Sequence, residues 1–299
     1  MPPRSDRLPI ALRLAPLWGL ALVLAAAPAR AAERGPGGDA IASEDALPRL
    51  PPAREVIERA FENFYQCDLH ADLDFVVRRG GVTVLQYETE LLRKYVRGMA
   101  NELFYFEGDG DRRGIRVLRI EQRDRADDAF VYLPELQRIR RVVMAQHADK
   151  LMGMEVTLED LEIQRVDKFE IVGRSYSALD GEPVHVVTLK RLLESAYDRV
   201  DFFIAARDYA MLEVRYYRRG MLEPYKTTRM SRAWMEYYPH RVLPKRIDFL
   251  DRDAGTETTL LFRRRDVDPE LSASRFSTLS LEKSLHLSEL GKWTRERGE

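Results

Sequence analysis

The most restrictive feature of this sequence is a long series of short segments in which apolar and polar residues alternate, separated by turn-forming residues. Leu73–Arg79 and Val82–Leu91 flank Gly80-Gly81, a pair typical of a hairpin turn. Similar segments follow at 101–108, 115–122, 130–144, 169–177, 182–191, 199–206, 210–217, 225–236, 241–250 and 256–265. About ten strands joined by short turns predict one antiparallel sheet, and a sheet of that size curls. We therefore expect a mainly β protein whose curved sheet forms an incomplete (half) β-barrel.

Two segments with helical periodicity flank these strands. Residues 53–67 follow Pro51 and Pro52, which are tolerated at a helix start, and they carry one apolar stripe. This stripe consists of Val56, Ile57, Ala60, Phe61 and Phe64. A second helical pattern covers 280–290, and residues 144–163 predict a loop with a helical turn. We expect these few helices to form a lid over the concave face of the sheet.

The first 31 residues differ in composition from the rest of the chain. Arg4, Arg7 and Arg13 precede an apolar run at 15–29, and Ala29-Arg30-Ala31 is typical of a cleavage site. We interpret residues 1–31 as a secretory signal peptide. The alternative is an uncleaved anchor, but the run is short for the ~20 residues that a membrane span needs. Residues 32–52 are then a flexible linker, and residues 53–299 a single domain.

Composition and cysteine content exclude several classes of protein. Hydrophobic residues make up 45% of the chain, which argues against global disorder, and the net charge of −1 gives no reason to expect nucleic acid as a partner. Cys67 is the only cysteine, so no intramolecular disulfide forms. It lies too far past the cleavage site to carry a lipid anchor. We expect it to be a small buried residue at the end of the first helix.

No pattern of catalytic or metal-binding residues stands out. The five histidines have no metal-ligand spacing: His70, His147, His185, His240 and His286. Neither a Gly-x-Ser-x-Gly elbow nor a phosphate-binding glycine loop occurs. Adjacent carboxylates such as Asp127-Asp128 carry little information in a chain with 49 acidic residues. We therefore predict that the protein is not an enzyme and has no catalytic residues, no metal site and no cofactor.

Adjacent aromatic residues in the strands pose a packing problem. Phe104, Tyr105 and Phe106 must point alternately to opposite faces of the sheet. One explanation is a second apolar layer on the outer face. The other is an apolar interior that accepts an acyl chain, in a pocket with few charges inside.

The segment at 130–144, FVYLPELQRIRRVVM, places arginine beside aliphatic residues on both faces of a strand. Arg138 and Arg140 share a face with Val142, whereas Arg141 shares the other face with Ile139. Neither face is cleanly polar or apolar, so alternation does not show which of them lines an interior.

This segment and the one after it resemble the outer-membrane lipoprotein-sorting protein family, the longer relatives of the LolA-type periplasmic carriers. Members typically show Tyr-Leu-Pro-x-Leu-x-Arg-x-Arg-Arg followed by a Met-Gly…Glu-Asp-Leu segment. The matching residues here are Tyr132, Leu133, Pro134, Leu136, Arg138, Arg140, Arg141, Met152, Gly153, Glu159, Asp160 and Leu161. Val156 and Leu158 stand where the family more often has aromatic residues.

The resemblance, which covers roughly 53–283, implies a LolA-like half-barrel with helices as a lid over an apolar cavity. It also implies which residues belong to the lid or ligand region. These are Tyr132, Leu133, Arg138, Arg140, Arg141, Met152, Gly153, Glu159 and Asp160. The arginines of this set either pair with Glu159 or Asp160 or meet an anionic head group. The alternative is that they pair with acidic neighbours on a solvated face.

The function that the resemblance implies is carriage of lipid or acylated lipoprotein through the periplasm, for sorting to or export toward the outer membrane. Acylated lipoprotein, phospholipid, hopanoid and other polycyclic lipids would all suit an apolar half-barrel. The partner implied is an inner-membrane transporter of the resistance-nodulation-division (RND) type. The alternative function is a periplasmic regulatory or interaction module that senses envelope lipid or protein.

Overall fold

The computed structural model describes residues 50–107, 114–142 and 150–282. The predicted signal peptide and all but the end of the predicted linker lie outside these ranges. The residues in these ranges belong to one compact unit. None of the helices in the described ranges is long and apolar enough to cross a membrane.

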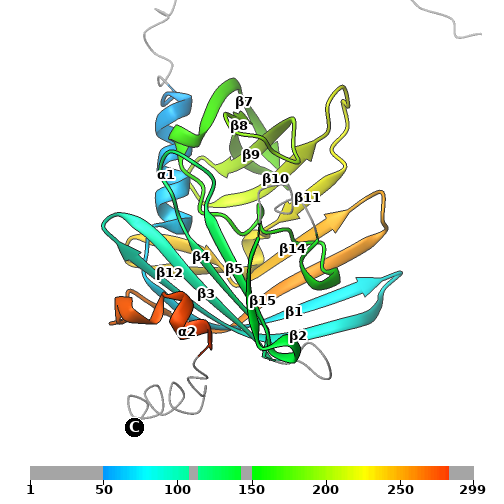
Figure 1. The fold of residues 1–299 in the computed structure, drawn as a ribbon. Helices are drawn as coiled ribbons and strands as arrows, with labels where there is room; N and C mark the ends of the chain where they lie inside the picture. Colours follow the sequence, from blue (N-terminus) through cyan, green and yellow to red (C-terminus); the bar gives the residue numbers. More distant parts are fainter. Residues whose placement is uncertain (1–49, 108–113, 143–149, 283–299) are drawn as a thin grey trace, which may run out of the picture. The chain divides into compact units, whose positions relative to one another are not determined.

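One large antiparallel sheet dominates the fold (Figure 1). Its 13 strands have the order β6-β5-β4-β3-β2-β1-β15-β14-β11-β10-β9-β8-β7, so β6 and β7 are the two open edges. The strands are β1 (Leu69–Arg79), β2 (Val82–Val96), β3 (Met99–Glu107), β4 (Arg116–Ile120), β5 (Asp128–Leu133), β6 (Arg138–Val142), β7 (Phe169–Leu179), β8 (Glu182–Arg191), β9 (Arg199–Ala205), β10 (Met211–Tyr217), β11 (Lys226–Arg229), β14 (Arg246–Asp251) and β15 (Thr256–Val267). The prediction of a mainly β fold with a curved sheet that is not closed into a barrel is confirmed.

Helices are short and few in the described part of the chain. The two α-helices are α1 (Ala53–Tyr65) and α2 (Thr278–Glu282), and the 3₁₀ turns are η3 (Pro134–Leu136), η5 (Leu151–Gly153), η6 (Val166–Lys168), η7 (Arg232–Trp234) and η8 (Ala273–Arg275). The predicted helix at 53–67 therefore ends two residues early. Cys67 follows it and is buried, as expected.

Two segments that were each predicted as one strand, 225–236 and 241–250, are broken in the structure, so both predictions are wrong. Residues 241–250 divide at Lys245 into β13 (Arg241–Pro244) and β14, which belong to different sheets. The break in 225–236 comes after β11. β11 ends at Arg229, the chain turns through η7, and the next residues form β12 (Met235–Tyr238), which pairs with β13 (Arg241–Pro244) in a separate two-stranded sheet. Arg232 explains the break, because its guanidinium donates to Glu182 at 2.6 Å and to Asp208 at 2.9 Å. Holding both carboxylates draws the chain out of the plane of the large sheet.

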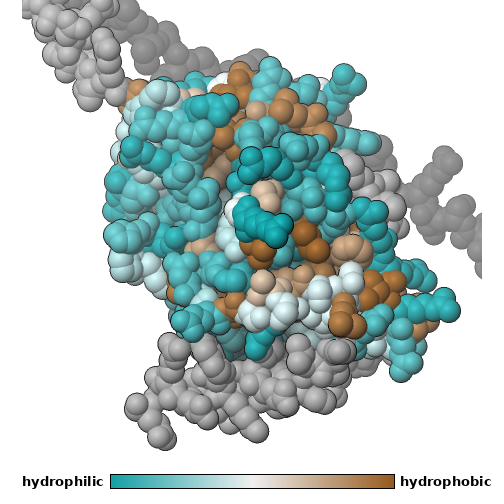
Figure 2. All heavy atoms as spheres, turned by 60° about the vertical axis from the view of Figure 1, so that its left-hand side comes forward, coloured by the Kyte–Doolittle hydropathy of each residue, from teal (hydrophilic) through white to brown (hydrophobic). Residues whose placement is uncertain are grey.

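Apolar side chains cover both faces of the large sheet. The inner face, which we define by its main apolar cluster, packs against α1, and Phe61 of α1 meets Phe202 of β9 edge-to-face at 5.3 Å. The outer face carries a smaller cluster under α2: Leu92, Leu103, Tyr105, Leu118, Phe276 and Leu281. Phe104 and Phe106 thus belong to the inner face and Tyr105 to a second apolar layer. On the molecular surface, hydrophobic side chains form separate patches within a mostly hydrophilic face (Figure 2).

Candidate ligand cavity on the inner face

A cavity of about 110 Å³ lies on the inner face, beside α1. Apolar side chains from β2, β3, β7, β9, β10, β14 and β15, and from the residue after β11, form most of its wall. They include Leu91, Phe104, Phe169, Val200, Phe202, Met211, Val214, Met230, Ile247, Phe249, Leu260 and Phe262. Inward-facing positions of many strands meet here because the sheet curls, so residues far apart in sequence line one space.

Charged residues also line the cavity, which corrects the expectation of few charges inside. Arg93, Glu102, Glu159, Asp160 and Arg191 all contribute to its wall. Each of these charges is paired, as buried charges must be. The cavity therefore has an apolar body and a polar end in which opposite charges compensate one another.

Glu102 is the centre of one buried ion network at this polar end. Its carboxylate accepts from Arg93 at 2.6 Å and from Arg119, which also donates to Asp127 at 2.8 Å. Burial alone would raise the pKa of Glu102, but Arg119 and Arg93 outweigh it and the pKa is lowered from the usual 4.5. Glu102 therefore stays ionised although it is almost fully buried.

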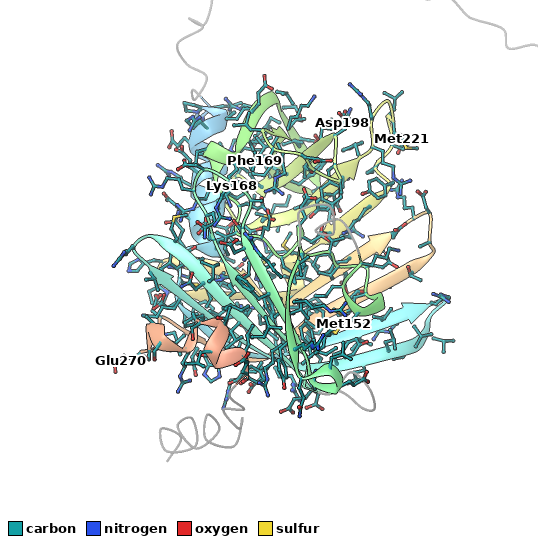
Figure 3. All side chains as sticks on the ribbon, viewed as in Figure 1. Met152, Lys168, Phe169, Asp198, Met221 and Glu270 are labelled. Carbon is teal, nitrogen blue, oxygen red and sulfur yellow. The ribbon has the colours of Figure 1, made fainter. Side chains whose placement is uncertain are left out.

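Residues 150–168, here called the strap, cross the inner face and cover the cavity. Figure 3 shows Met152 and Lys168, near the two ends of the strap, well apart over the sheet. The strap buries apolar side chains among the inner-face cluster: Met154, Val156, Leu158 and Ile163. Between them it buries carboxylates that bind basic and hydroxyl groups of the strands.

The first anchor of the strap is at β2 and β15. Tyr87 donates its hydroxyl to the carbonyl of Met152 at 3.1 Å. The backbone N–H of Glu155 donates to Thr258 at 2.8 Å, and the carboxylate of Glu155 accepts from the hydroxyl of Thr256. These contacts fix the strap to the middle of the sheet.

The second anchor is Asp160. Its carboxylate accepts from the Tyr197 hydroxyl at 2.5 Å, from the ammonium of Lys226, and from the backbone N–H of Thr157 at 2.7 Å. Burial, with Asp160 as the next cause, raises the pKa of the Tyr197 hydroxyl well above its usual range, so this hydroxyl remains a donor.

The third anchor is Arg191, at the end of β8. Its guanidinium donates to Glu159 at 2.9 Å and to Glu162 at 2.5 Å. Glu159 also accepts from the backbone N–H of Ala196 at 3.1 Å. The Glu-Asp pair of the predicted motif therefore binds two separate groups of sheet residues.

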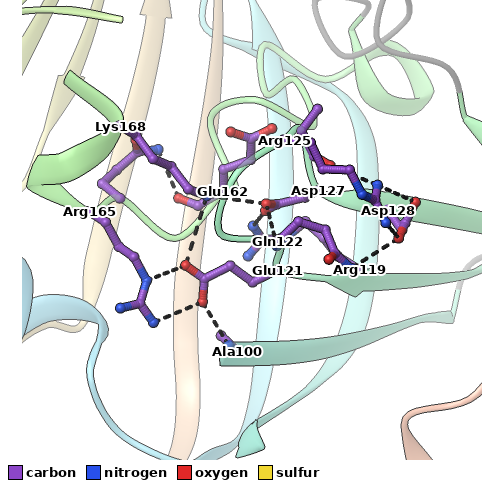
Figure 4. Close-up of polar contacts among 12 residues, drawn as sticks. Ala100, Arg119, Glu121, Gln122, Arg125, Asp127, Asp128, Glu162, Arg165 and Lys168 are labelled. Carbon is purple, nitrogen blue, oxygen red and sulfur yellow. Dashed lines mark hydrogen bonds and ion pairs between the residues drawn. The ribbon is translucent and has the colours of Figure 1, made fainter. Parts of the chain in front are cut away.

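The last anchor attaches the end of the strap to the segment between β4 and β5 (Figure 4). Arg165 pairs with Glu121, and Lys168 lies 3.2 Å from Asp127. Asp127 is also the partner of Arg119, so this anchor joins the Glu102 network.

The two halves of the predicted motif lie in different places. Met152, Gly153, Glu159 and Asp160 belong to the strap, and the last two line the cavity. By contrast, Leu133 ends β5, and Arg138 and Arg140 belong to the edge strand β6, away from the cavity wall. Tyr132 stacks on Arg116 on the outer face, with 4.8 Å between the guanidinium and the ring centre. A ligand role for this half stays a prediction.

The arginines of β6 do not pair with Glu159 or Asp160, whose partners are the strand residues given above. Arg141 pairs instead with Asp128 of the adjacent strand, and no ion pair of Arg138 or Arg140 occurs within the described ranges. All three are exposed on an open sheet edge. Charges along such an edge disfavour pairing with a strand of another chain, which explains why arginine occurs on both faces.

Gly153 has a conformational reason to be glycine. Its φ is +81° and that of Met152 is +50°, so the chain makes a left-handed turn here. An added Cβ would lie 3.3 Å from Cδ1 of Leu85.

Gly153→Ala should lower the free energy of unfolding by about 1–2 kcal/mol, measured by denaturant titration. Gly181→Ala, at φ +82° in a hairpin turn with open space around it, is the matched control for backbone strain alone, and no loss at Gly153 would contradict the left-handed turn.

Sequence reasoning missed the basic partners of the strap, namely Arg191 and Lys226. The sequence does contain a signal for Arg191. Val187 and Leu189 of β8 point to the inner face, and Arg191 is the next residue on that face, where an apolar side chain is expected. That position predicts a buried ion pair but not its partner.

The open, curved antiparallel sheet of this chain is shared with solved structures of the lipoprotein-sorting class. The chain is similar to a putative outer membrane lipoprotein-sorting protein domain from Vibrio parahaemolyticus, with a TM-score of 0.71 and 20% identity over 77% of this chain and 97% of that one. A LolA superfamily protein from Nitrosomonas europaea gives a TM-score of 0.61 and 17% identity, covering 77% and 99%.

The family follows from the sequence match. A family model described as "Uncharacterized protein" matches residues 98–283, and the chain belongs to this family, which is of the DUF1329 type. A DUF1329 family protein from Desulfovibrio piger has the same fold, with a TM-score of 0.68 and 19% identity over 77% of this chain and 97% of that one. A comparison with curated proteins found no match. The predicted resemblance to the lipoprotein-sorting proteins is confirmed in fold.

Proposed function

We propose that this protein is a periplasmic carrier that binds the acyl chains of a lipid or lipoprotein in the inner-face cavity. The observation that carries the proposal is the wall of apolar side chains enclosed between the sheet, α1 and the strap. Burial of an acyl chain there contributes about 0.8 kcal/mol per CH₂ group. Binding of this kind needs no nucleotide and no chemical step.

The proposal requires the cavity to expand when it binds an acyl chain. Its 110 Å³ is less than the ~150 Å³ cavity that holds a benzene molecule. Met211 and Met230 line it, and methionine side chains adapt their shape at low cost. The strap is the other element that can yield, because polar contacts rather than strand pairing hold much of it in place.

The periplasmic location in this proposal is supported by the predicted signal peptide and by the fold shared with lipoprotein-sorting proteins. The proposed carriage between inner and outer membrane is supported by the same likeness. An RND-type transporter as the membrane partner stays a prediction.

The first test is co-purification of lipid. The chain from Ala32 onward, produced by export and purified without detergent, should show a discrete lipid adduct in native mass spectrometry. Val214→Trp fills the cavity wall on β10 and should abolish the adduct. Leu212→Trp, on the opposite face of the same strand, is the matched control and should retain it. Val214→Ala, which enlarges the cavity, should retain it as well.

A chain that carries no lipid and takes up neither added fatty acid nor phospholipid would contradict the carrier. So would equal loss of the adduct in both tryptophan variants, since the bound lipid would then lie elsewhere. Thermal unfolding of each variant shows whether the loss comes from filling the cavity or from unfolding.

A further inference from the structure

A row of polar side chains crosses the outer face of the sheet, on the side away from the cavity. Backbone pairing places one residue from each of six neighbouring strands in this row. In order they are Arg264, Asp72, Glu90, Tyr105, Arg116 and Tyr132. His70 belongs to the adjacent row, in which its neighbours on the next three strands are apolar: Leu92, Leu103 and Leu118. His70 thus stands where a polar row meets an apolar one.

Three groups that can bind a metal ion converge in this part of the outer face. The imidazole of His70 and the carboxylates of Asp72 and Glu90 each place one ligand atom within 4.8 Å of the other two. His70 Nε2 is 2.7 Å from Glu90 Oε1, and both side chains are only 7% exposed. A histidine and a carboxylate so deeply buried do not belong to an ordinary solvated surface.

Two buried polar atoms beside these groups lack hydrogen-bond partners among the described residues. One is the second carboxylate oxygen of Glu90, and the other is the hydroxyl of Tyr105, its register neighbour on β3. A buried polar atom without a partner costs about 1–3 kcal/mol. Two such atoms next to a convergent ligand set indicate that an additional atom completes the site in the native protein.

We infer that His70, Asp72 and Glu90 bind a divalent transition-metal ion. One imidazole and two carboxylates suit Zn²⁺, which takes nitrogen and oxygen ligands at about 2.0–2.2 Å in tetrahedral geometry. Ligand atoms then stand about 3.3 Å apart, so His70 Nε2 and Glu90 Oε1 need to separate by well under 1 Å. We assign the fourth position to a water held by the Tyr105 hydroxyl, because Tyr105 is the register neighbour of Glu90 and its hydroxyl lacks a partner among the described residues.

Asp72 provides the path for entry. Its side chain is partly exposed, and its carboxylate forms an ion pair with Arg264, with 3.0 Å between nitrogen and oxygen. Arg264 is itself half-exposed and can turn away into solvent. It competes with the metal ion for Asp72, so its charge should weaken metal binding. The site is separate from the cavity, and the inference does not depend on the carrier function.

The test is a titration of the metal-stripped full chain with Zn²⁺ by calorimetry, after treatment with a chelator and its removal. The wild-type chain should bind one ion, and His70→Gln and Glu90→Gln should each lower the affinity by about 100-fold or more. His185→Gln is the matched control: His185 is also a buried strand histidine, on β8, outside this cluster, and the affinity should stay unchanged. Arg264→Gln should raise the affinity several-fold.

Two further variants keep the inference testable if the His70 or Glu90 variants fail to fold. Asp72→Asn changes a half-exposed ligand and should weaken Zn²⁺ binding in a folded chain, shown by an unchanged melting profile without metal. Cys67→Ser should bind as the wild type does. The inference would be overturned if the wild-type chain did not bind Zn²⁺ one-to-one, or if it bound Mg²⁺ but not Zn²⁺. It would also be overturned if binding required Cys67, or if His70→Gln and His185→Gln had equal affinities for Zn²⁺.

Discussion

Replacing Glu102 with alanine is expected to lower the free energy of unfolding by about 3–5 kcal/mol, because two buried arginines lose the carboxylate that they share. Arg93 and Arg119 both donate to Glu102, and the side chain of Arg119 is only 2% exposed. Neither arginine can reach water without disrupting the inner face. Denaturant unfolding followed by circular dichroism measures the loss.

Glu58→Ala is the control for this prediction. Glu58 pairs with Arg54 on the exposed side of α1, and surface pairs contribute only about 0.5 kcal/mol. A loss at Glu102 no larger than that at Glu58 would contradict the buried network.

The same network predicts how stability depends on pH. Because the pKa of Glu102 is lowered in the folded chain, its contribution is fully present above the usual value of 4.5 and is lost as pH falls through the folded pKa. Wild-type stability should therefore fall with acid below pH 4.5 more steeply than that of Glu102→Ala. Parallel acid profiles would mean that the pKa of Glu102 is the same in the folded and the unfolded chain, which would contradict the lowered pKa.

Replacing Arg191 with alanine is the second large effect that we expect. Glu159 and Glu162 of the strap would lose their shared guanidinium while remaining buried, at a cost of about 3–5 kcal/mol if the strap stays in place. A strap that opens avoids this cost. Hydrogen exchange should therefore rise first in residues 150–168, ahead of the strands.

Lys190→Ala is the matched control for Arg191. Lys190 is the preceding residue on β8, faces the other way, and is 53% exposed and 3.9 Å from Asp198. It should change neither stability nor exchange. Equal loss of protection in the strap and in the strands of Arg191→Ala would contradict a strap that opens separately. Faster acyl uptake by this variant would connect the strap with access to the cavity.

Local patterns in the sequence were sufficient to predict the sheet and α1. Alternation and hairpin signals such as Gly80-Gly81 depend on neighbouring residues, so they can be recognised in the sequence without knowledge of the fold. The break after β11 could not be predicted in this way, because Arg232 binds Glu182 and Asp208, and both are distant in sequence. Turn and strand patterns contain no information about such partners.

The candidate sites depend even more on distant pairs. Asp160 and Lys226 are both visible as charged residues, but only the curl of the sheet brings them together beneath the strap. On the outer face, His70 and Asp72 share a face by their spacing alone. Glu90 joins them because β1 and β2 pair in one particular register, which the sequence pattern did not define.

The strap also limits how far the curved sheet can open. Its anchors at Thr258 of β15, Lys226 of β11 and Arg191 of β8 join strands that are not neighbours in the sheet, so the strap is a chord across an arc. Flattening the sheet would increase the distance between these strands, and at least one of the anchors would then break. A few polar contacts of the strap therefore limit how far the sheet can open, and a guest that needs a wider space must compete with them rather than with the strand hydrogen bonds.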